Sequence, residues 1–230
     1  MFSRNTMIRL ASSLALMPLV IFLIIAGGWW FGIFVALAFG LAYGEWFSLC
    51  KATRRTVPYL IIGTLYFSIS FSEFVYLRNF IENGVYLTLL CLFMVWASDT
   101  GGYVFGKKIG GPLMTPTISP KKTWSGMVGA VTSSAIIFAL GLIFAAHLNF
   151  MIPNTINVSL IQLPLIVLAG AIMGYVGQVG DLLISSLKRR AQAKDSGHLI
   201  PGHGGILDRI DSLLLVIPVF VIVARYVVNS

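Results

Sequence analysis

The stretch that decides the fold runs from Trp124 to Leu148, WSGMVGAVTSSAIIFALGLIFAAHL, and contains no Asp, Glu, Lys or Arg. About 20 residues of apolar helix cross a bilayer, so this run predicts a transmembrane helix. Six further runs are long enough, or nearly so, to do the same: Leu10–Ala26, Trp29–Leu49, Val57–Phe71, Gly84–Ser98, Leu160–Leu187 and Leu213–Val228. The sequence therefore predicts an all-α, polytopic transmembrane bundle of about seven spans. It forms one membrane domain over 1–230, with N-terminal spans in 1–98 and the chemistry in 99–230.

The composition agrees with a membrane protein. Hydrophobic residues make up 57% of the 230 residues and charged residues only 10%, against about 25% in soluble domains. The net charge of +8 comes from short basic clusters between apolar runs. That pattern favours membrane topology and phosphate contact over nucleic-acid binding.

The first run has a second interpretation. Basic residues precede it and the small residues Ala26, Gly27 and Gly28 end it, as in a secretory signal peptide. We favour a retained helix, because the run is joined tightly to the next span at Trp29 and Trp30.

The basic residues indicate an orientation, because Lys and Arg collect in cytoplasmic loops. With the N-terminus inside, fourteen of the sixteen lysines and arginines fall on the cytoplasmic side. Only Arg78 and Arg225 fall outside. A wrong number of spans would scramble this alternation, so the distribution supports both the count and a cytoplasmic N-terminus.

The same topology places every aspartate at the cytoplasmic face. They are Asp99, Asp181, Asp195, Asp208 and Asp211. Acids at helix ends commonly serve as caps, which would suit Asp99 at the end of the fourth run and Asp211 at the start of the seventh. Asp181 is different, because apolar residues surround it and an unpaired charge at that depth is costly. We expect Asp181 to be functional.

Polar residues are densest in the segment 185–211, after the sixth run. Asp208 and Asp211 are three residues apart, so on a helix they share a face. Two carboxylates held that close repel unless a cation lies between them, and hard oxygen ligands suit Mg²⁺. The alternative is an ordinary acidic helix start. With Asp181 nearby, we predict Mg²⁺ bound by Asp181, Asp208 and Asp211, with a second cation left open.

The same segment is also basic and rich in glycine. Gly204 and Gly205 follow His203, and glycines let a backbone approach a ligand and turn its N–H groups toward an anion. A plain turn is the alternative, and His203 is open between phosphate donor, proton carrier and packing residue. Lys188, Arg189 and Lys194 satisfy the positive-inside rule on their own, but their mixture with acids favours phosphate binding.

A second predicted inner loop begins at Asp99 and ends with Ser119, Lys121, Lys122 and Thr123, just before a new helix. A helix N-terminus with hydroxyls and lysines nearby is a ready anion site. The GxxxxGK[ST] spacing of a P-loop is absent. Taken alone, this loop is better explained as a capped helix start with topogenic lysines.

The segment from Ser185 to Asp211 resembles the signature of the phosphatidate cytidylyltransferases, also called CDP-diglyceride synthases. The positions that carry the resemblance are Ser185, Lys188, Arg189, Lys194, Asp195, His203, Gly204, Gly205, Asp208, Arg209 and Asp211. Asp99-Thr100-Gly101, the run from Ser119 to Trp124, and Gly180-Asp181 are also similar to the family. The first 90 or so residues agree only in being apolar spans.

The resemblance implies that CTP and phosphatidic acid give CDP-diacylglycerol and pyrophosphate, with Mg²⁺ required, at the cytoplasmic face of a bacterial inner membrane. It implies catalytic roles for Asp181, Asp208, Asp211 and Lys188. It also implies substrate binding by Asp99, Ser119, Lys121, Lys122, Thr123, Arg189, Lys194, His203, Gly204, Gly205 and Arg209. The implied partners are both substrates and the lipid bilayer, and a homodimer is left open.

The sequence departs from the family pattern at two positions. Ser125 stands where a Glu is expected after Trp124, and Ile184 stands where the family often has an acid. Neither carboxylate can therefore be essential in this chain, which concentrates the predicted metal chemistry on the aspartates.

Two other classes compete with this interpretation. A relative acting on another lipid phosphate or on a polyprenol would share the same features. A secondary transporter would also carry intramembrane acids, but it would usually show internal repeats and charges near mid-membrane. The sequence shows no internal repeat, and its acids fall at the inner edge of the membrane rather than near its middle.

Overall fold

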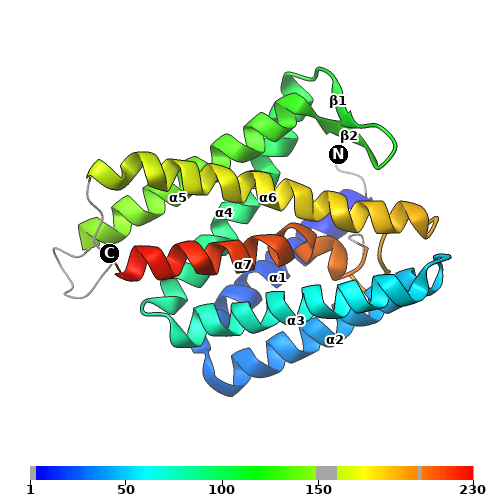
Figure 1. Ribbon diagram of the computed structural model, residues 1–230, viewed down its shortest axis with the longest axis horizontal. Coiled ribbons are helices and arrows are strands. Elements are labelled where there is room, and N and C mark those ends of the chain that lie inside the picture. Colours follow the sequence, from blue (N-terminus) through cyan, green and yellow to red (C-terminus); the bar gives the residue numbers. More distant parts are fainter. Residues whose placement is uncertain (1–3, 149–159, 201–203, 230) are drawn as a thin grey trace.

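Seven α-helices form the bundle in the computed structural model, which describes residues 4–148, 160–200 and 204–229 (Figure 1). They are α1 (Arg4–Ala26), α2 (Gly28–Lys51), α3 (Thr56–Phe80), α4 (Gly84–Lys108), α5 (Trp124–Leu148), α6 (Leu163–Arg190) and α7 (Leu207–Asn229). A 3-10 turn, Leu160–Gln162, precedes α6. Each of the seven predicted apolar runs falls on one α-helix, except that the first three residues of Leu160–Leu187 form the 3-10 turn. The predicted all-α membrane bundle is confirmed.

Two helices continue well past the C-terminal ends of their apolar runs. α3 continues past Phe71 to Phe80, and Arg78 in its last turns donates hydrogen bonds to the carbonyls of Ile24 (3.0 Å) and Ile25 (3.3 Å) at the end of α1. α4 continues past Ser98 to Lys108, so the prediction that Asp99 ends this helix is wrong. In both helices the apolar sequence ends where polar contacts begin, but the helix itself continues through the polar residues.

Five helices, α2 to α6, are long and apolar enough to cross a membrane by length and composition, among the residues described. The described apolar part of α1, Ala15–Ala26, is shorter. Large apolar side chains cover the outside of the bundle, for example Trp29, which is 87% exposed. Such a surface suits lipid rather than water, so the chain is an integral membrane protein.

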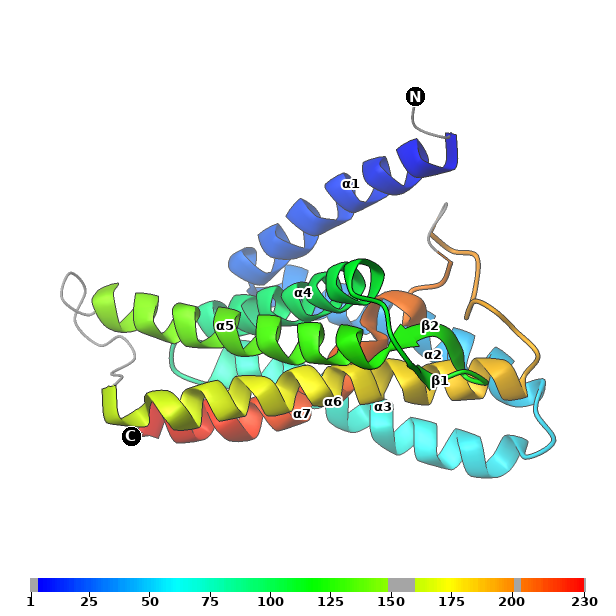
Figure 2. The same ribbon diagram turned by 90° about the horizontal axis from the view of Figure 1, so that it is seen from above.

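Helices α4, α5, α6 and α7 pack side by side, whereas α1 leaves the bundle at an angle (Figure 2). Glycine allows the closest contacts, as is common between membrane helices. A Cβ at Gly129 of α5 would lie 2.6 Å from the Gly101 carbonyl oxygen of α4, and one at Gly180 of α6 would lie 2.9 Å from the Asp211 carbonyl oxygen of α7. The second contact brings Asp181 and Asp211 to the same level of the bundle.

A small antiparallel hairpin of β1 (Leu113–Thr115) and β2 (Ser119–Thr123) connects α4 to α5. The sequence did not predict these strands, because neither is apolar enough or long enough to stand out. Ser125 closes the base of the hairpin by donating to the Gly110 carbonyl at 2.5 Å. The residue that replaces the expected Glu therefore has a structural contact.

The other departure from the family pattern is also explained by packing. Ile184 is 1% exposed and belongs to an apolar cluster beneath the polar end of the bundle. The buried members of the cluster are Ala42, Trp46, Leu49, Cys50, Phe67, Ile184, Leu187, Leu207 and Leu214. They come from α2, α3, α6 and α7, so this cluster fixes the ends of four helices next to the site.

Candidate active site

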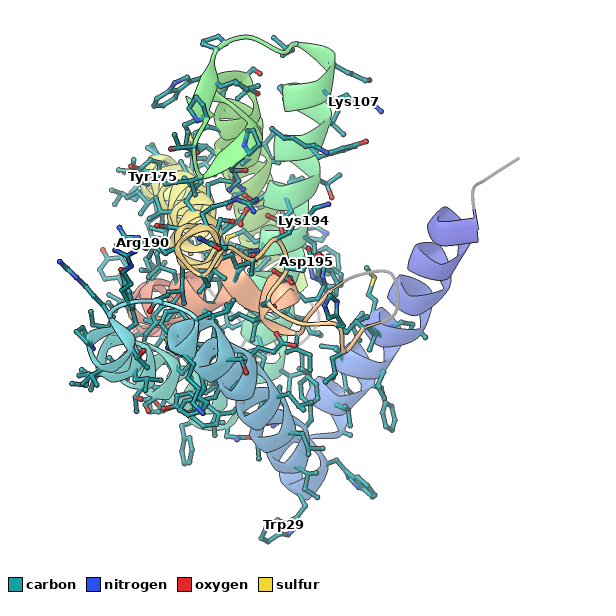
Figure 3. All side chains as sticks on the ribbon, turned by 90° about the vertical axis from the view of Figure 1, so that its right-hand side faces the viewer. Trp29, Lys107, Tyr175, Arg190, Lys194 and Asp195 are labelled. Carbon is teal, nitrogen blue, oxygen red and sulfur yellow. The ribbon has the colours of Figure 1, made fainter. Side chains whose placement is uncertain are left out.

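A cavity of about 460 Å³ lies at the end of the bundle that carries the hairpin and the α6–α7 loop, which we call the loop end. Its volume falls within the range of about 300–1,000 Å³ common for ligand pockets. The charged residues that line it are Asp99, Lys121, Lys122, Asp181, Lys188, Asp195, Asp208, Arg209 and Asp211. The structure therefore brings all five aspartates and four predicted cations to one cavity. Figure 3 looks onto the loop end, with Asp195 near its middle.

Asp181 is paired in the structure. The Lys122 ammonium lies 2.7 Å from its Oδ2, and the Ser185 hydroxyl donates to its Oδ1 at 3.1 Å. Lys122 also donates to the Gln178 carbonyl at 3.3 Å. The lysine predicted for phosphate binding thus neutralises the acid predicted for metal binding, and it links the hairpin to α6.

Asp211 lies within electrostatic range of Asp181 and Asp99. These three carboxyl groups come from α7, α6 and α4, and the absent side chain of Gly180 permits the close approach of α6 and α7. The positive charges of Lys122 and Arg209 attract the Asp99 carboxylate, and the Ser212 hydroxyl donates a hydrogen bond to it. The aspartate predicted as a helix end is therefore part of an acidic group on the cavity wall.

The donor set suits a hard divalent cation, because carboxylate oxygens are the ligands that Mg²⁺ prefers. Among the described residues, no three side chains of His, Cys, Asp or Glu form a ready-made metal site. Mg²⁺ usually takes only one or two protein carboxylates and completes its shell with water and phosphate oxygens. Asp181 and Asp211 are two carboxylates on the wall of one cavity, which fits that donor number.

Asp208 has a different environment from the other acids. Its Oδ1 accepts a hydrogen bond from Lys188 at 2.6 Å, and its Oδ2 accepts from the backbone N–H groups of Ser196 (2.8 Å) and Gly205 (3.1 Å). The side chains of Lys188 and Asp208 are only 9% and 7% exposed. Asp208 therefore organises the α6–α7 loop, and its role as a metal ligand stays a prediction.

Thr123 caps a helix. Its hydroxyl accepts a hydrogen bond from the Gly126 N–H at 3.1 Å and shares one with the Ser125 hydroxyl at 2.9 Å. An N-terminal cap of this kind is the structural role the sequence suggested for this loop. Thr123 also lines the cavity, together with Lys121.

Five predicted substrate-binding residues lie outside the cavity lining in the described part of the chain: Ser119, Arg189, Lys194, Gly204 and Gly205. Arg189 donates to the Ile118 carbonyl at 3.0 Å and to the Ala193 carbonyl at 3.1 Å, so it ties α6 to the hairpin. Lys194 is exposed on the loop (Figure 3).

The glycines of the loop are close to the acids. Gly204 has a φ of +82°, and a Cβ there would lie 2.8 Å from the Asp208 carboxylate. Gly205 donates to that carboxylate. His203 lies outside the described residues.

Sequence reasoning missed Glu45. It lies on α2, and its carboxylate accepts three hydrogen bonds from the α6–α7 loop and the start of α7. The only sequence signal was an acid near the inner end of an apolar run. Its partners begin at Ser196, 151 residues further along the chain, and no sequence pattern connects them to Glu45.

Taken together, the fold and the cavity define an integral membrane protein with a cavity at one end of its bundle, whose lysines and arginine suit phosphate-bearing ligands. The model of the cytidylyltransferase family matches residues 7–81 and 56–227. A relative from Rickettsia felis, named phosphatidate cytidylyltransferase, is 36% identical over 219 residues, covering 94% of this chain and 91% of the relative. A protein of the same name from Staphylococcus haemolyticus is 35% identical over 187 residues, covering 80% and 64%. The chain belongs to the cytidylyltransferase family.

Proposed function

We propose that the protein transfers the cytidylyl group of CTP to phosphatidic acid, forming CDP-diacylglycerol and pyrophosphate for phospholipid synthesis. The observation that carries the proposal is the cavity where acids and cations meet at one end of an apolar bundle. A lipid substrate can keep its chains in the bilayer while its phosphate enters such a cavity. The relatives carry the name of this activity over most of the chain.

The reaction needs positioning more than proton transfer. The phosphate of phosphatidic acid is largely a dianion near pH 7, since its second pKa is about 6. One of its oxygens attacks the α-phosphorus of CTP, a new P–O bond forms, and the bond to the bridging oxygen of the β-phosphate breaks. Pyrophosphate leaves with that electron pair. The residues of the site must hold the two phosphates in line and offset their charge.

Cations of the cavity supply that charge. Lys121 and Arg209 line the cavity from the hairpin and from α7. Lys122 and Lys188 each hold an aspartate, and arriving phosphates would compete for Lys122, which is the more exposed of the two. Among the other predicted phosphate contacts, Ser119 and Thr123 would act from the two ends of β2, and Arg189 from the last turn of α6. The rest would act from the segment between α6 and α7: Lys194, His203, Gly204 and Gly205.

Asp181 and Asp211, beside Asp99, would hold Mg²⁺. When bound, this ion would neutralise charge on the phosphates and on the leaving pyrophosphate. A carboxylate offers about four lone-pair sites, and Asp208 already accepts three hydrogen bonds. Asp208 would join the ion only through the acceptor capacity that these bonds leave free.

The orientation belongs to the same proposal. We place the N-terminus and the loop end in the cytoplasm of a bacterial cell, with α1 and α7 as spans in addition to α2–α6. The distribution of lysines and arginines supports this placement, and it lets CTP reach the cavity directly.

The direct test is an assay of purified protein with CTP, Mg²⁺ and phosphatidic acid in mixed micelles, following pyrophosphate and the CDP-lipid together. We expect equimolar formation of both products. The same assay with an isoprenoid ether-lipid phosphate or a polyprenol separates the alternatives. Turnover of one of these, with none of phosphatidic acid, would contradict the proposal.

A further inference from the structure

Glu45 joins the N-terminal half of the chain to the segment that carries the family signature. Its Oε1 accepts a hydrogen bond from the Ile206 N–H at 3.0 Å. Its Oε2 accepts from the Leu207 N–H at 2.9 Å and from the Ser196 hydroxyl at 2.7 Å. One carboxylate on α2 therefore holds both the loop after α6 and the start of α7.

The two backbone donors explain why a carboxylate is needed. The first N–H groups of a helix have no partner within the helix and carry its positive end. A side chain just before the helix usually accepts them, but Gly205 and Ile206 offer no acceptor. Glu45 supplies from another helix the cap that the sequence before α7 lacks, and its charge strengthens the bonds.

Glu45 and Asp208 hold the same loop from two sides. The Ser196 backbone N–H donates to Asp208, while its hydroxyl donates to Glu45. The Gly205 N–H also donates to Asp208, and a Cβ at Gly205 would overlap the Glu45 carboxylate and the Ser196 hydroxyl. The space between the two carboxylates is therefore too small for a side chain at position 205.

The position of this grip matters for the cavity. Asp208 and Asp211 lie in the first turns of α7 and line the cavity, whereas Glu45 is absent from its described lining. A shift of the start of α7 would move both aspartates. Glu45 can therefore influence the reaction without touching a substrate.

We propose that Glu45 is a positioning residue for the transfer reaction, fixing the α6–α7 loop and the first turn of α7 so that Asp208 and Asp211 face the cavity correctly. The activity part of this inference rests on the proposed function. α2 has its own anchor in the bundle, because Trp46 is buried and donates to the Tyr59 carbonyl at 3.2 Å. Removing the charge of Glu45 should therefore disturb the loop and leave the bundle intact.

The test compares Glu45→Gln with Glu82→Gln, a control that removes the same charge from an exposed turn at the opposite end. Gln replaces one carboxylate oxygen by an NH₂ group, so the Ile206 and Leu207 N–H groups can no longer each donate to an oxygen of their own. In Glu45→Gln we expect kcat at saturating CTP to fall about 10- to 100-fold, as small misplacements do. We also expect the Ile206 and Leu207 amides to exchange hydrogen about tenfold faster, with a nearly unchanged melting temperature. The control should match the wild type in all three measurements.

Ser196→Ala is a second, milder variant that keeps the proposal testable if Glu45→Gln does not fold. It removes one of the three hydrogen bonds to Glu45 and leaves the two that cap α7. We expect a smaller loss of kcat in the same direction. Wild-type kcat and wild-type amide exchange in a folded Glu45→Gln or Ser196→Ala variant would overturn the proposal. A fall in kcat that only follows a fall in melting temperature would also overturn it. If the wild-type protein itself makes no CDP-lipid, the proposed function fails, and the exchange measurement still decides whether Glu45 holds the loop.

Discussion

At the scale of single residues, the acids of the cavity are not equivalent. Asp211 stands beside Asp181 and Asp99, whereas Asp208 is almost fully engaged with Lys188 and two backbone N–H groups. Burial and the neighbouring carboxylates both disfavour a negative charge on Asp211, whereas three hydrogen bonds hold the charge of Asp208. The same substitution should therefore have different consequences in the two places.

We expect Asp211→Asn to abolish most turnover and to raise the Mg²⁺ concentration for half-maximal rate, while the melting temperature stays near normal or rises. The physical reason is that the variant removes a negative charge that faces two others. Activity against Mg²⁺ concentration and thermal unfolding in detergent check this. An unchanged rate with wild-type Mg²⁺ dependence would reduce Asp211 to a helix-end residue. Asp195→Asn, on the exposed loop, should be milder.

We expect Asp208→Asn to lose activity and stability together. Removing one partner of a buried ion pair typically costs about 3–5 kcal/mol, because the other charge is left uncompensated. Asn keeps one acceptor oxygen, so the loss should fall near the lower end of that range. The comparison of its melting temperature with that of Asp211→Asn is the decisive measurement, and equal stabilities would contradict the structural role of Asp208.

Arg209 should behave as a substrate contact, because it lines the cavity and is exposed. Loss of one charge-assisted phosphate contact costs about 1.5–3 kcal/mol. We therefore expect Arg209→Ala to lower kcat/KM about ten- to a hundredfold, with near-normal unfolding. Steady-state kinetics with CTP and phosphatidic acid varied in turn would show which phosphate it binds. Wild-type kinetics for both would leave Arg209 as a topogenic charge.

At the scale of helices and strands, apolarity located every helix, but contacts between distant segments decided where each one ends. α4 continues past Asp99 because its polar turns line the cavity and pack on α5. The hairpin depends on pairing and on the contact of Ser125 with Gly110, neither of which leaves a periodic pattern. The aspartates and basic residues of the signature were recognised because they stand close together in sequence. Glu45 could not be assigned, because its partners come from the other half of the chain.

The close packing of α4 on α5 gives a prediction at this scale. A Cβ at Gly129 would lie 2.5 Å from the Phe105 Cβ, whereas one at Gly40 would meet nothing within 4 Å. Overpacking of this kind typically costs about 1–3 kcal/mol. We expect Gly129→Ala to lower the melting temperature and Gly40→Ala, its matched helical control, to leave it unchanged or slightly raised. Equal melting temperatures would mean that α4 and α5 do not meet at Gly129.

At the scale of the whole molecule, the two ends of the bundle differ in charge. The loop end carries the cavity, the hairpin and the basic clusters at the ends of α2, α4 and α6. The opposite end carries a pair of Arg225 and the half-buried Glu73 at 3.9 Å, with Arg225 over the Tyr76 ring at 4.5 Å. Such a bundle has one preferred orientation in a membrane, because basic segments stay in the cytoplasm.

That polarity makes the orientation testable. A reporter fused after Ser230 should read as exterior, and one inserted in the hairpin at Pro116 should read as cytoplasmic. Successive helices run in alternate directions (Figure 1), so the two sites lie at opposite ends of the bundle. Opposite readings require an odd number of spans between the hairpin and the C-terminus, which α5, α6 and α7 supply. Matching readings at the two sites would remove α7 or another helix from the membrane. A cytoplasmic reading after Ser230 with an exterior reading at Pro116 would keep the number of spans but invert the bundle. The cavity would then face away from the cytoplasm and its CTP, which would contradict the proposed orientation.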